Sequence, residues 1–168
     1  MDLMEANKHG WRTTAHKMYD AGGQGDGVGN NHAFTAAEYG PGASVCADSV
    51  FFCNSGAEAN EAAIKLARKH AHQRRGIEQP VILTAAASFH GRTLAAVTAT
   101  GQPKYHKGFE PLVGGFDYFP YNDLSALEGL INRHEQSGPA VAAVLIEPLQ
   151  GEGGVNPGDR AFFARLRE

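Results

Sequence analysis

The sequence predicts an α/β fold in which a mostly parallel sheet is flanked by helices. Short apolar segments alternate with segments of helical periodicity from about Cys46 onward, and this alternation is typical of strands joined by crossover helices. Residues 141–146 form a continuous apolar run, as expected of a parallel strand that is buried on both faces. Ligands of such sheets bind beyond the carboxyl ends of the strands, so candidate site residues are expected there.

Each expected element follows from a local pattern. The strands are apolar runs, and the helices carry apolar side chains at helical spacing, such as Leu124, Leu127, Leu130 and Ile131 on one face. The expected strands cover residues 49–53, 80–84, 116–119 and 141–146. The expected helices cover residues 57–73 and 123–134, and another begins over 161–167.

The chain divides into two regions of different character. Residues 1–44 are glycine-rich and weakly patterned, and the glycines between Gly22 and Gly29 have no strand before them and no apolar helix after them. A phosphate-binding interpretation of these glycines therefore fails, and a disordered or misannotated segment is favoured. Residues 45–168 are expected to form part of one large domain, because the chain stops at Glu168 inside a predicted helix without a cap.

Composition excludes several classes of function. The 168 residues suffice for one domain with a core, and scattered basic residues with a net charge of −3 argue against a nucleic-acid partner. No run is long and apolar enough to span a membrane. The cysteines Cys46 and Cys53 and the eight histidines show no metal-binding spacing. We therefore expect a cytoplasmic protein with free thiols and no metal.

A sharp strand-to-helix turn at Ser55, Gly56 and Ala57 is the first candidate site. The first amides of a helix lack intrahelical partners, and the helix dipole adds partial positive charge there, so such a turn attracts a phosphate. Gly56 and Ala57 have no bulk that would keep a ligand away from the backbone. The turn therefore predicts where a phosphorylated ligand would bind, but not which one.

The same turn has a simpler interpretation. Ser55 and Glu58 match a capping box, and Glu61 and Lys65 are spaced to form a favourable pair on the polar side of the helix. Because capping boxes are common, this pattern taken alone favours an ordinary capped helix.

A second candidate follows the strand over 80–84, in the run Phe89-His90-Gly91-Arg92-Thr93. Gly91 permits a backbone bend, Phe89 offers a flat face to a planar ring, and Arg92 can hold a carboxylate in a fork of two hydrogen bonds. Taken alone, the run favours a plain turn with a half-buried aromatic residue and a solvated arginine.

The third candidate is the loop from Glu147 to Gly154. An acid at the end of a buried strand is costly unless it meets a partner, and Pro148 and the glycines allow Glu147 and Glu152 to reach different parts of one site. A surface loop with solvated acids explains Glu147 equally well and is favoured for Glu152.

These motifs occur together, in order, at the ends of neighbouring expected strands. In this combination the chain resembles the class III aminotransferases, which are pyridoxal-phosphate enzymes of fold type I, and most of all their acetylornithine aminotransferase group of arginine biosynthesis. The resemblance covers residues 44 to 168 and implies part of the fold type I large domain. It is carried by Cys53-Asn54-Ser55-Gly56-Ala57-Glu58-Ala59-Asn60-Glu61, Phe89-His90-Gly91-Arg92-Thr93, Gly101-Gln102-Pro103-Lys104-Tyr105 and Glu147-Pro148-Leu149-Gln150-Gly151-Glu152-Gly153-Gly154.

The resemblance implies roles in binding pyridoxal 5′-phosphate. The positions of Gly56 and Ala57 give backbone N–H groups to the cofactor phosphate, with Ser55 adjacent. The position of Phe89 stacks on the pyridine ring, and that of Glu147 lies near the cofactor and its supporting polar network.

It also implies roles in substrate binding. The position of Arg92 pairs with the α-carboxylate of the amino acid, and that of Glu152 pairs with a downstream arginine and tunes how glutamate and the ornithine-type substrate are told apart. His90 receives no role.

The implied reaction moves the amino group of N-acetylornithine to 2-oxoglutarate. It needs a lysine that holds the cofactor and an aspartate on the pyridine nitrogen, and in the family both lie downstream of the loop that ends at Gly154. Because Lys65, Lys69, Lys104 and Lys107 do not match the lysine position, we expect a fragment that is inactive alone and whose dimerisation is doubtful, although the family forms homodimers.

Other interpretations stay open. Within class III, the amino donor could be ornithine, succinylornithine or 4-aminobutyrate. Outside it, a non-catalytic module that binds a phosphate ligand and a non-functional product of a gene-model error are the alternatives. The gene-model error is suggested by the lack of family likeness over residues 1–43.

Overall fold

The computed structural model describes residues 53–167. The glycine-rich region 1–44 and residues 49–52 of the first expected strand lie outside these residues. The chain separates into two units, Met1–Ser55 and Gly56–Glu168, and all described elements belong to the second. In chain order they are α3 (Gly56–Arg75), β1 (Val81–Ala85), α4 (Leu94–Ala99), the 3₁₀ helix η2 (Pro103–Tyr105), β2 (Phe116–Phe119), α5 (Leu124–Ser137), β3 (Val141–Leu145), β4 (Leu149–Gln150), β5 (Asn156–Pro157) and α6 (Arg160–Leu166).

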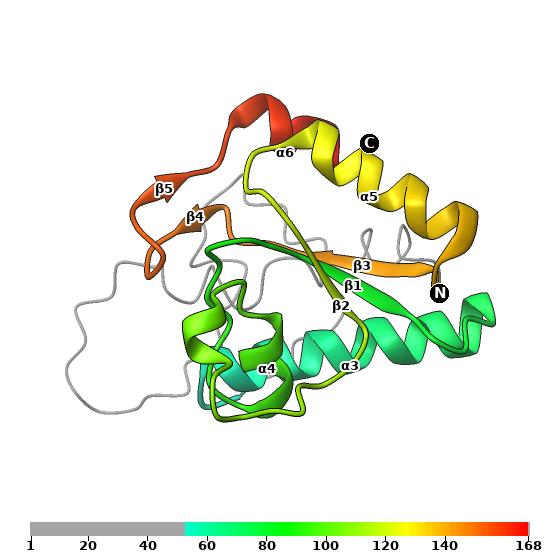
Figure 1. The fold of residues 1–168 in the computed structure, drawn as a ribbon, viewed down its shortest axis with the longest axis horizontal. Coiled ribbons are helices and arrows are strands. Elements are labelled where there is room, and N and C mark those ends of the chain that lie inside the picture. Colours follow the sequence, from blue (N-terminus) through cyan, green and yellow to red (C-terminus); the bar gives the residue numbers. More distant parts are fainter. Residues whose placement is uncertain (1–52, 168) are drawn as a thin grey trace, which may run out of the picture. The chain divides into compact units, whose positions relative to one another are not determined.

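The three longer strands form a parallel sheet in the order β2-β1-β3 (Figure 1). In the register, Ile82 of β1 lies beside Phe116 of β2 and Ala143 of β3. Both pairs run parallel, with a register irregularity between Val81 and Ile82. The predicted parallel α/β architecture is confirmed.

Helices cover both faces of this sheet. Alternate side chains of β1 point to opposite sides, so each face offers apolar groups against which helices pack. Its residues Val81, Leu83 and Ala85 pack with Phe119, Leu127, Leu130 and Phe162 on the side of α5 and α6. Ile82 packs with Ile64 of α3 and Ala99 of α4 on the other side. Figure 1 shows the same three layers, with α5 and α6 above the sheet and α3 and α4 below it.

Capping side chains mark the starts of two helices. Asp123 accepts a hydrogen bond from the backbone N–H of Ala126 at the start of α5, and Asp159 accepts one from Phe162 at the start of α6. Helix α5 runs three residues beyond its expected end, and β1 is shifted by one residue. The elements α4, η2, β4 and β5 were not expected, because each is too short to show a period.

One detail of the sheet differs from expectation. The strand over 141–146 was expected to be buried on both faces, yet only Ala142 is fully buried and Val141, Val144 and Leu145 are half-buried. Among the described strands, β3 has a neighbour on one side only, which leaves part of its surface open.

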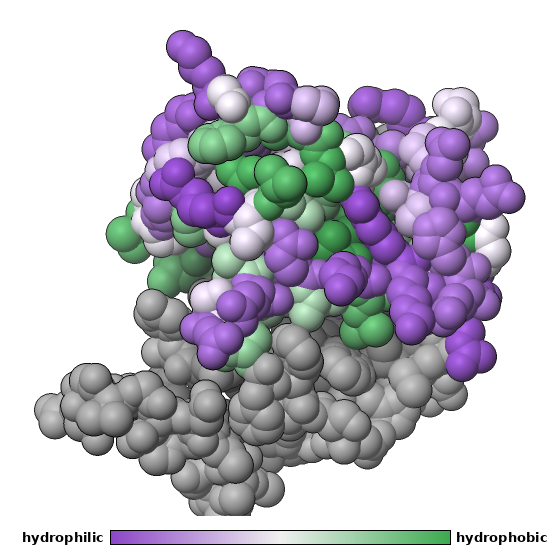
Figure 2. Space-filling model, turned by 90° about the horizontal axis from the view of Figure 1, so that it is seen from below, coloured by the Kyte–Doolittle hydropathy of each residue, from purple (hydrophilic) through white to green (hydrophobic). Residues whose placement is uncertain are grey.

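The surface on the side of α3 and α4 mixes hydrophobic and polar groups (Figure 2). Leu66 of α3 and Leu94 of α4 are exposed. No helix within residues 53–167 is long and apolar enough to cross a membrane. The same residues contain no group of three or more histidine, cysteine, aspartate or glutamate side chains that could hold a metal ion.

Candidate functional site

The first turn of α3 is open, and another turn of the chain packs against it. Within residues 53–167, a Cβ atom added at Gly56 would meet no atom within 4 Å apart from its chain neighbours and the backbone of its own helix. By contrast, a Cβ atom at Gly91 would lie 2.7 Å from the Cβ of Ala57, and the φ of Gly91 is +127°. Only glycine fits there, so Gly91 brings the turn of residues 89–92 against the start of α3. Ser55 immediately precedes this helix and is exposed.

Glu61 does not form the expected pair with Lys65. Its Oε1 instead accepts hydrogen bonds from the Thr93 hydroxyl at 2.5 Å and from the backbone N–H groups of Ala95 and Ala96, each at 3.1 Å. These amides belong to the first turn of α4, where the side chain of Thr93 makes no capping bond of its own. Glu61 therefore caps α4 from the neighbouring helix.

The turn after β1 is held in an unusual backbone conformation. Ala87 has a φ of 59°, in the left-handed region that favours glycine. Its N–H donates to the carbonyl of Gly101 at 2.8 Å, and Gly153 lies so close that a Cβ atom there would be 2.0 Å from the Ala87 carbonyl oxygen. Backbone from three distant segments thus meets at Ala87.

His90 is buried and connects this turn to the neighbouring elements by hydrogen bonds. Its ring Nε2 lies 3.1 Å from the Thr84 hydroxyl, its N–H donates to the Thr100 hydroxyl at 2.9 Å, and its carbonyl accepts from the Asn60 side-chain amide at 2.7 Å. Burial lowers the pKa of His90 from 6.5 to about 4, so the ring is neutral at neutral pH. His90, which received no role from the sequence, connects the turn to β1, α3 and the end of α4.

Phe89 and Glu147 meet at the carboxyl ends of β1 and β3. The N–H of Phe89 donates to the Glu147 carboxylate at 3.1 Å, and the Tyr121 hydroxyl donates to the Glu147 backbone carbonyl at 2.9 Å. Burial raises the pKa of Glu147 from 4.5 to about 7 against the lowering effect of the Phe89 N–H, and the negative charge of Glu152 raises it further. The carboxyl group can therefore gain or lose a proton near neutral pH.

Arg92 lies against two aromatic rings. Its guanidinium carbon is 4.1 Å from the centre of the Tyr105 ring and 5.5 Å from that of Phe89. The two rings themselves pack edge to face, with centres 5.8 Å apart. Cation–π attraction holds the guanidinium group there, while the side chain remains exposed and can still offer its N–H groups to a carboxylate.

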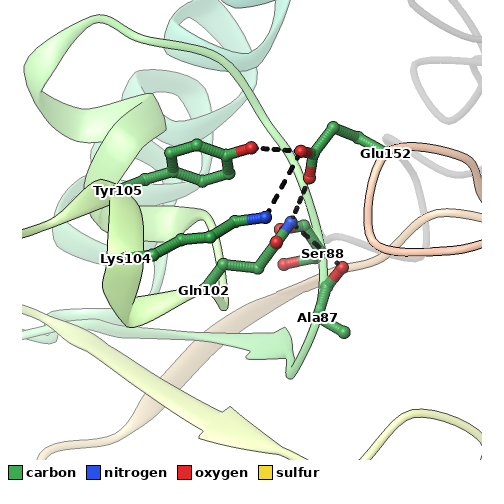
Figure 3. A network of polar contacts seen from close by, with 6 residues as sticks. All are labelled: Ala87, Ser88, Gln102, Lys104, Tyr105 and Glu152. Atoms are coloured by element: carbon green, nitrogen blue, oxygen red, sulfur yellow. Dashed lines mark hydrogen bonds and ion pairs between the residues drawn. The ribbon is translucent and has the colours of Figure 1, made fainter.

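Glu152 is the centre of a polar network drawn in Figure 3. Its carboxylate accepts hydrogen bonds from the Gln102 side-chain amide at 2.5 Å and from the Tyr105 hydroxyl. The ammonium group of Lys104 lies 3.6 Å away. The hydrogen bond from Tyr105, then that from Gln102, lowers the pKa of Glu152, and Lys104 contributes less.

The β4–β5 hairpin carries Glu152 and is fixed to the end of β1. Gln150 of β4 is buried, and its side-chain amide donates to the Ala86 carbonyl at 2.8 Å. Asn156 of β5 donates to the Gln150 side-chain oxygen at 3.2 Å. The position of Glu152 is thus tied to the turn that presents Phe89 and Arg92.

The structure brings Phe89, Arg92, Glu147 and Glu152 into one connected cluster. Sequence reasoning gave no role to Gln102 or Tyr105, although the run 101–105 was part of the family resemblance. The signal that finds them is three-dimensional: Gly101 lies against Ala86 in an isolated parallel bridge, which brings the residues after Gly101 to the same strand end.

Comparisons with known proteins identify the family of this chain and several of its relatives. Residues 25–168 match the family model of the class III aminotransferases, so the match begins upstream of Ser44. The chain is 80% identical over 122 residues to the acetylornithine aminotransferase of Parasynechococcus marenigrum, which covers 73% of this chain and 29% of that protein. It is 70% identical over 123 residues to the enzyme of the same name from Thermosynechococcus vestitus, covering 73% of this chain and 30% of that protein.

Solved structures show the same fold. An ornithine aminotransferase from Toxoplasma gondii aligns with a TM-score of 0.62 at 34% identity, over 68% of this chain and 26% of that chain. A transaminase from the marine bacterium Virgibacillus aligns with a TM-score of 0.63 at 30% identity, over 71% of this chain and 28% of that chain. The chain spans less than a third of the length of these relatives. It belongs to the class III aminotransferase family.

Proposed function

We propose that this chain supplies the phosphate side of the cofactor site of an enzyme that moves the amino group of N-acetylornithine to 2-oxoglutarate with pyridoxal 5′-phosphate, in arginine biosynthesis. The observation that carries the proposal is the contact of Gly91 with Ala57. This contact places the turn of Phe89 and Arg92 beside the open first turn of α3. The names of relatives up to 80% identical support N-acetylornithine as the amino donor.

The start of α3 fits a phosphate group. Gly56 and Ala57 lie in the first turn, where backbone N–H groups have no intrahelical acceptor and the helix dipole is positive. Among the described residues, only the chain neighbours and the backbone of α3 come within 4 Å of a Cβ position at Gly56. We assign the phosphate to the amides of Gly56 and Ala57, with Ser55 adjacent, as part of a large domain over residues 45–168.

The residues at the strand ends fit a planar ring. Phe89 offers an aromatic face, and its N–H orients the Glu147 carboxylate. With a pKa of about 7, Glu147 can hold a proton beside the ring at neutral pH. When bound, the cofactor supplies the electron sink that loosens bonds at the amino-bearing carbon.

Arg92 and Glu152 fit the two ends of an amino-acid substrate. The exposed guanidinium group of Arg92 suits an α-carboxylate, which it can bind through two parallel hydrogen bonds. Glu152 supplies a negative charge at the other end. This charge would repel a second carboxylate of the substrate and would accept a neutral or cationic group.

The chain alone is proposed to be inactive. Among residues 53–167, Lys65, Lys69 and Lys107 are exposed and Lys104 is paired with Glu152. Within residues 53–167, no hydrogen bond or ion pair joins any of these lysines to Phe89 or Glu147, so none is positioned as the amine of the reaction. Purified chain supplied with pyridoxal phosphate, N-acetylornithine and 2-oxoglutarate should form no glutamate, and measurable turnover would overturn this part of the proposal.

Cofactor binding tests the site itself. Equilibrium dialysis should show that the chain binds pyridoxal phosphate more tightly than pyridoxal, because the phosphate makes the contacts at α3. The variant Gly56→Asp should bind about tenfold more weakly than Gly56→Asn, whose side chain has nearly the same shape without the charge, because only the aspartate repels the phosphate. Equal binding of pyridoxal and its phosphate would sink the proposal, and inorganic phosphate that binds as tightly would favour a general phosphate-binding module.

The amino donor is tested in the full-length parent enzyme. N-acetylornithine should be used with a higher kcat/KM than ornithine, succinylornithine or 4-aminobutyrate. A preference for ornithine would move the chain to the group of the Toxoplasma gondii relative.

A further inference from the structure

We propose that Tyr105 is a positioning residue that holds Arg92 and Glu152 as one unit, with Gln102 fixing that unit to the turn after β1. The inference rests on the proposed function, because it assigns the spacing between the carboxylate-binding arginine and the acidic group that faces the substrate. Tyr105 and Gln102 would act on specificity through these two charged side chains rather than by touching the reacting atoms.

Tyr105 contacts both charged groups with different parts of its side chain. The ring lies 4.1 Å from the guanidinium carbon of Arg92, and the hydroxyl donates to the carboxylate of Glu152. Arg92 and Glu152 come from segments sixty residues apart in sequence. The side chain of Tyr105 thus sets the relative positions of the Arg92 guanidinium group and the Glu152 carboxylate.

Gln102 joins Glu152 to the turn after β1. Its side-chain amide donates to Glu152 at 2.5 Å and also to the carbonyl of Ser88 at 3.0 Å, and Figure 3 shows the amide between these two groups. The side chain is 9% exposed, so water competes little for these bonds. The turn that presents Phe89 and the loop that carries Glu152 therefore cannot shift independently.

A purely structural role explains these contacts less well. Tyr105 and Gln102 belong to neither hydrophobic core cluster of the described residues, and Tyr105 is only half-buried. The ring of Tyr105 also contacts a second cation besides Arg92, because the Lys104 ammonium lies 4.6 Å from its ring centre. Its side chain contacts the charged groups of Arg92, Lys104 and Glu152 and the ring of Phe89.

The link makes a chemical prediction about substrates. Three donors surround the Glu152 carboxylate, namely Tyr105, Gln102 and Lys104, and these donors favour its charged form. Burial raises the pKa of the nearby Glu147 to about 7, and the negative charge of Glu152 contributes to that rise. A substrate whose carboxylate binds Arg92 therefore meets a fixed negative charge at a set distance, which disfavours a second carboxylate unless another group neutralises it.

Nuclear magnetic resonance on the full chain can test the link directly. The Glu152 side-chain ¹³C signal reports its titration, and the Arg92 Nε–H signal reports whether Arg92 responds when Glu152 is protonated. In the native chain both signals should change with the same midpoint. Tyr105→Phe keeps the ring but removes the hydroxyl, so the Glu152 midpoint should rise and the Arg92 response at that midpoint should be lost.

Other variants separate the contributions. The rise of the Glu152 midpoint should be largest for Tyr105→Phe, smaller for Gln102→Leu and smallest for Lys104→Met, because the Lys104 side chain is 61% exposed and its charge is screened by solvent. Tyr105→Leu should also move the Arg92 signal away from its ring-shifted position at every pH. Tyr121→Phe is the matched control, because its hydroxyl bonds the Glu147 carbonyl and its loss should leave both signals unchanged.

Two results would overturn the proposal. One is a Glu152 midpoint in Tyr105→Phe equal to the native value, and the other is an Arg92 response to Glu152 protonation that survives in that variant. Neither readout requires the cofactor. A failure of cofactor binding at Gly56 would therefore refute the proposed function while leaving the link between Tyr105, Arg92 and Glu152 to be judged by its own signals.

Discussion

At the scale of single residues, Ala87 carries a cost that the site imposes. Its φ of 59° places an L side chain in the left-handed region, at about 1–2 kcal/mol. Ala87→Gly should stabilise the chain by about 0.5–1 kcal/mol, because relief of this strain exceeds the entropy that glycine adds to the unfolded chain. Urea unfolding at pH 7 measures the change.

The neighbouring alanine offers a matched control. Ala86 has no positive φ, and its N–H donates to the Phe119 carbonyl at 2.7 Å. Ala86→Gly should therefore destabilise the chain. If both glycine variants lost stability, the backbone at Ala87 would not be strained.

Single residues were also where sequence reasoning reached its limit. Phe89, Arg92 and Glu147 became candidates because they follow strands, but only the family resemblance gave them roles. The structure brings the three into one cluster, in which Phe89 contacts both Glu147 and Arg92. The left-handed conformation of Ala87 could not be predicted, because alanine carries no local signal for it. It arises from contacts with Gly101 and Gly153, which are distant in sequence.

At the scale of elements, α4 depends on a side chain from another helix. It has six residues, too few to be stable alone, and Glu61 of α3 accepts three hydrogen bonds at its start. Glu61→Ala should destabilise the chain by about 1–2 kcal/mol. Glu61→Gln should cost less, since it keeps an acceptor oxygen.

Chemical unfolding can measure this, with Glu78→Ala as the control. Glu78 is exposed in the segment between α3 and β1, so its loss should change the free energy of unfolding little. Equal effects of the Glu61 and Glu78 variants would show that capping by Glu61 contributes nothing.

Glu61 also shows why element contacts were harder to predict than the elements. The periodicity of residues 57–73 was sufficient to find α3, and the continuous run 141–146 was sufficient to find β3. The same periodicity suggested a bond from Glu61 to Lys65, since spacing within one helix was the only geometry available. Helix α4 has no visible period, so its need for an acceptor could not enter the argument.

At the scale of the whole molecule, the buried His90 and the half-buried Glu147 make stability depend on pH in opposite directions. The pKa of His90 falls to about 4 in the folded chain, so its contribution is present above pH 6.5 and is lost as the pH falls towards 4. The pKa of Glu147 rises to about 7, so its contribution is present below pH 4.5 and is lost as the pH rises through 7.

These two effects should partly cancel in the native chain and separate in variants. Between pH 7 and pH 5, protonation of His90 should cost about 2 kcal/mol of folding free energy. Protonation of Glu147, which is partly exposed and screened by solvent, should return about 1 kcal/mol. Glu147→Gln should thus lose stability on acidification, His90→Gln should gain it, and the double variant should change least. Urea unfolding at the two pH values measures each slope. Slopes of the same sign in the two single variants would refute this account, because His90, which Glu147→Gln retains, and Glu147, which His90→Gln retains, should change stability in opposite directions.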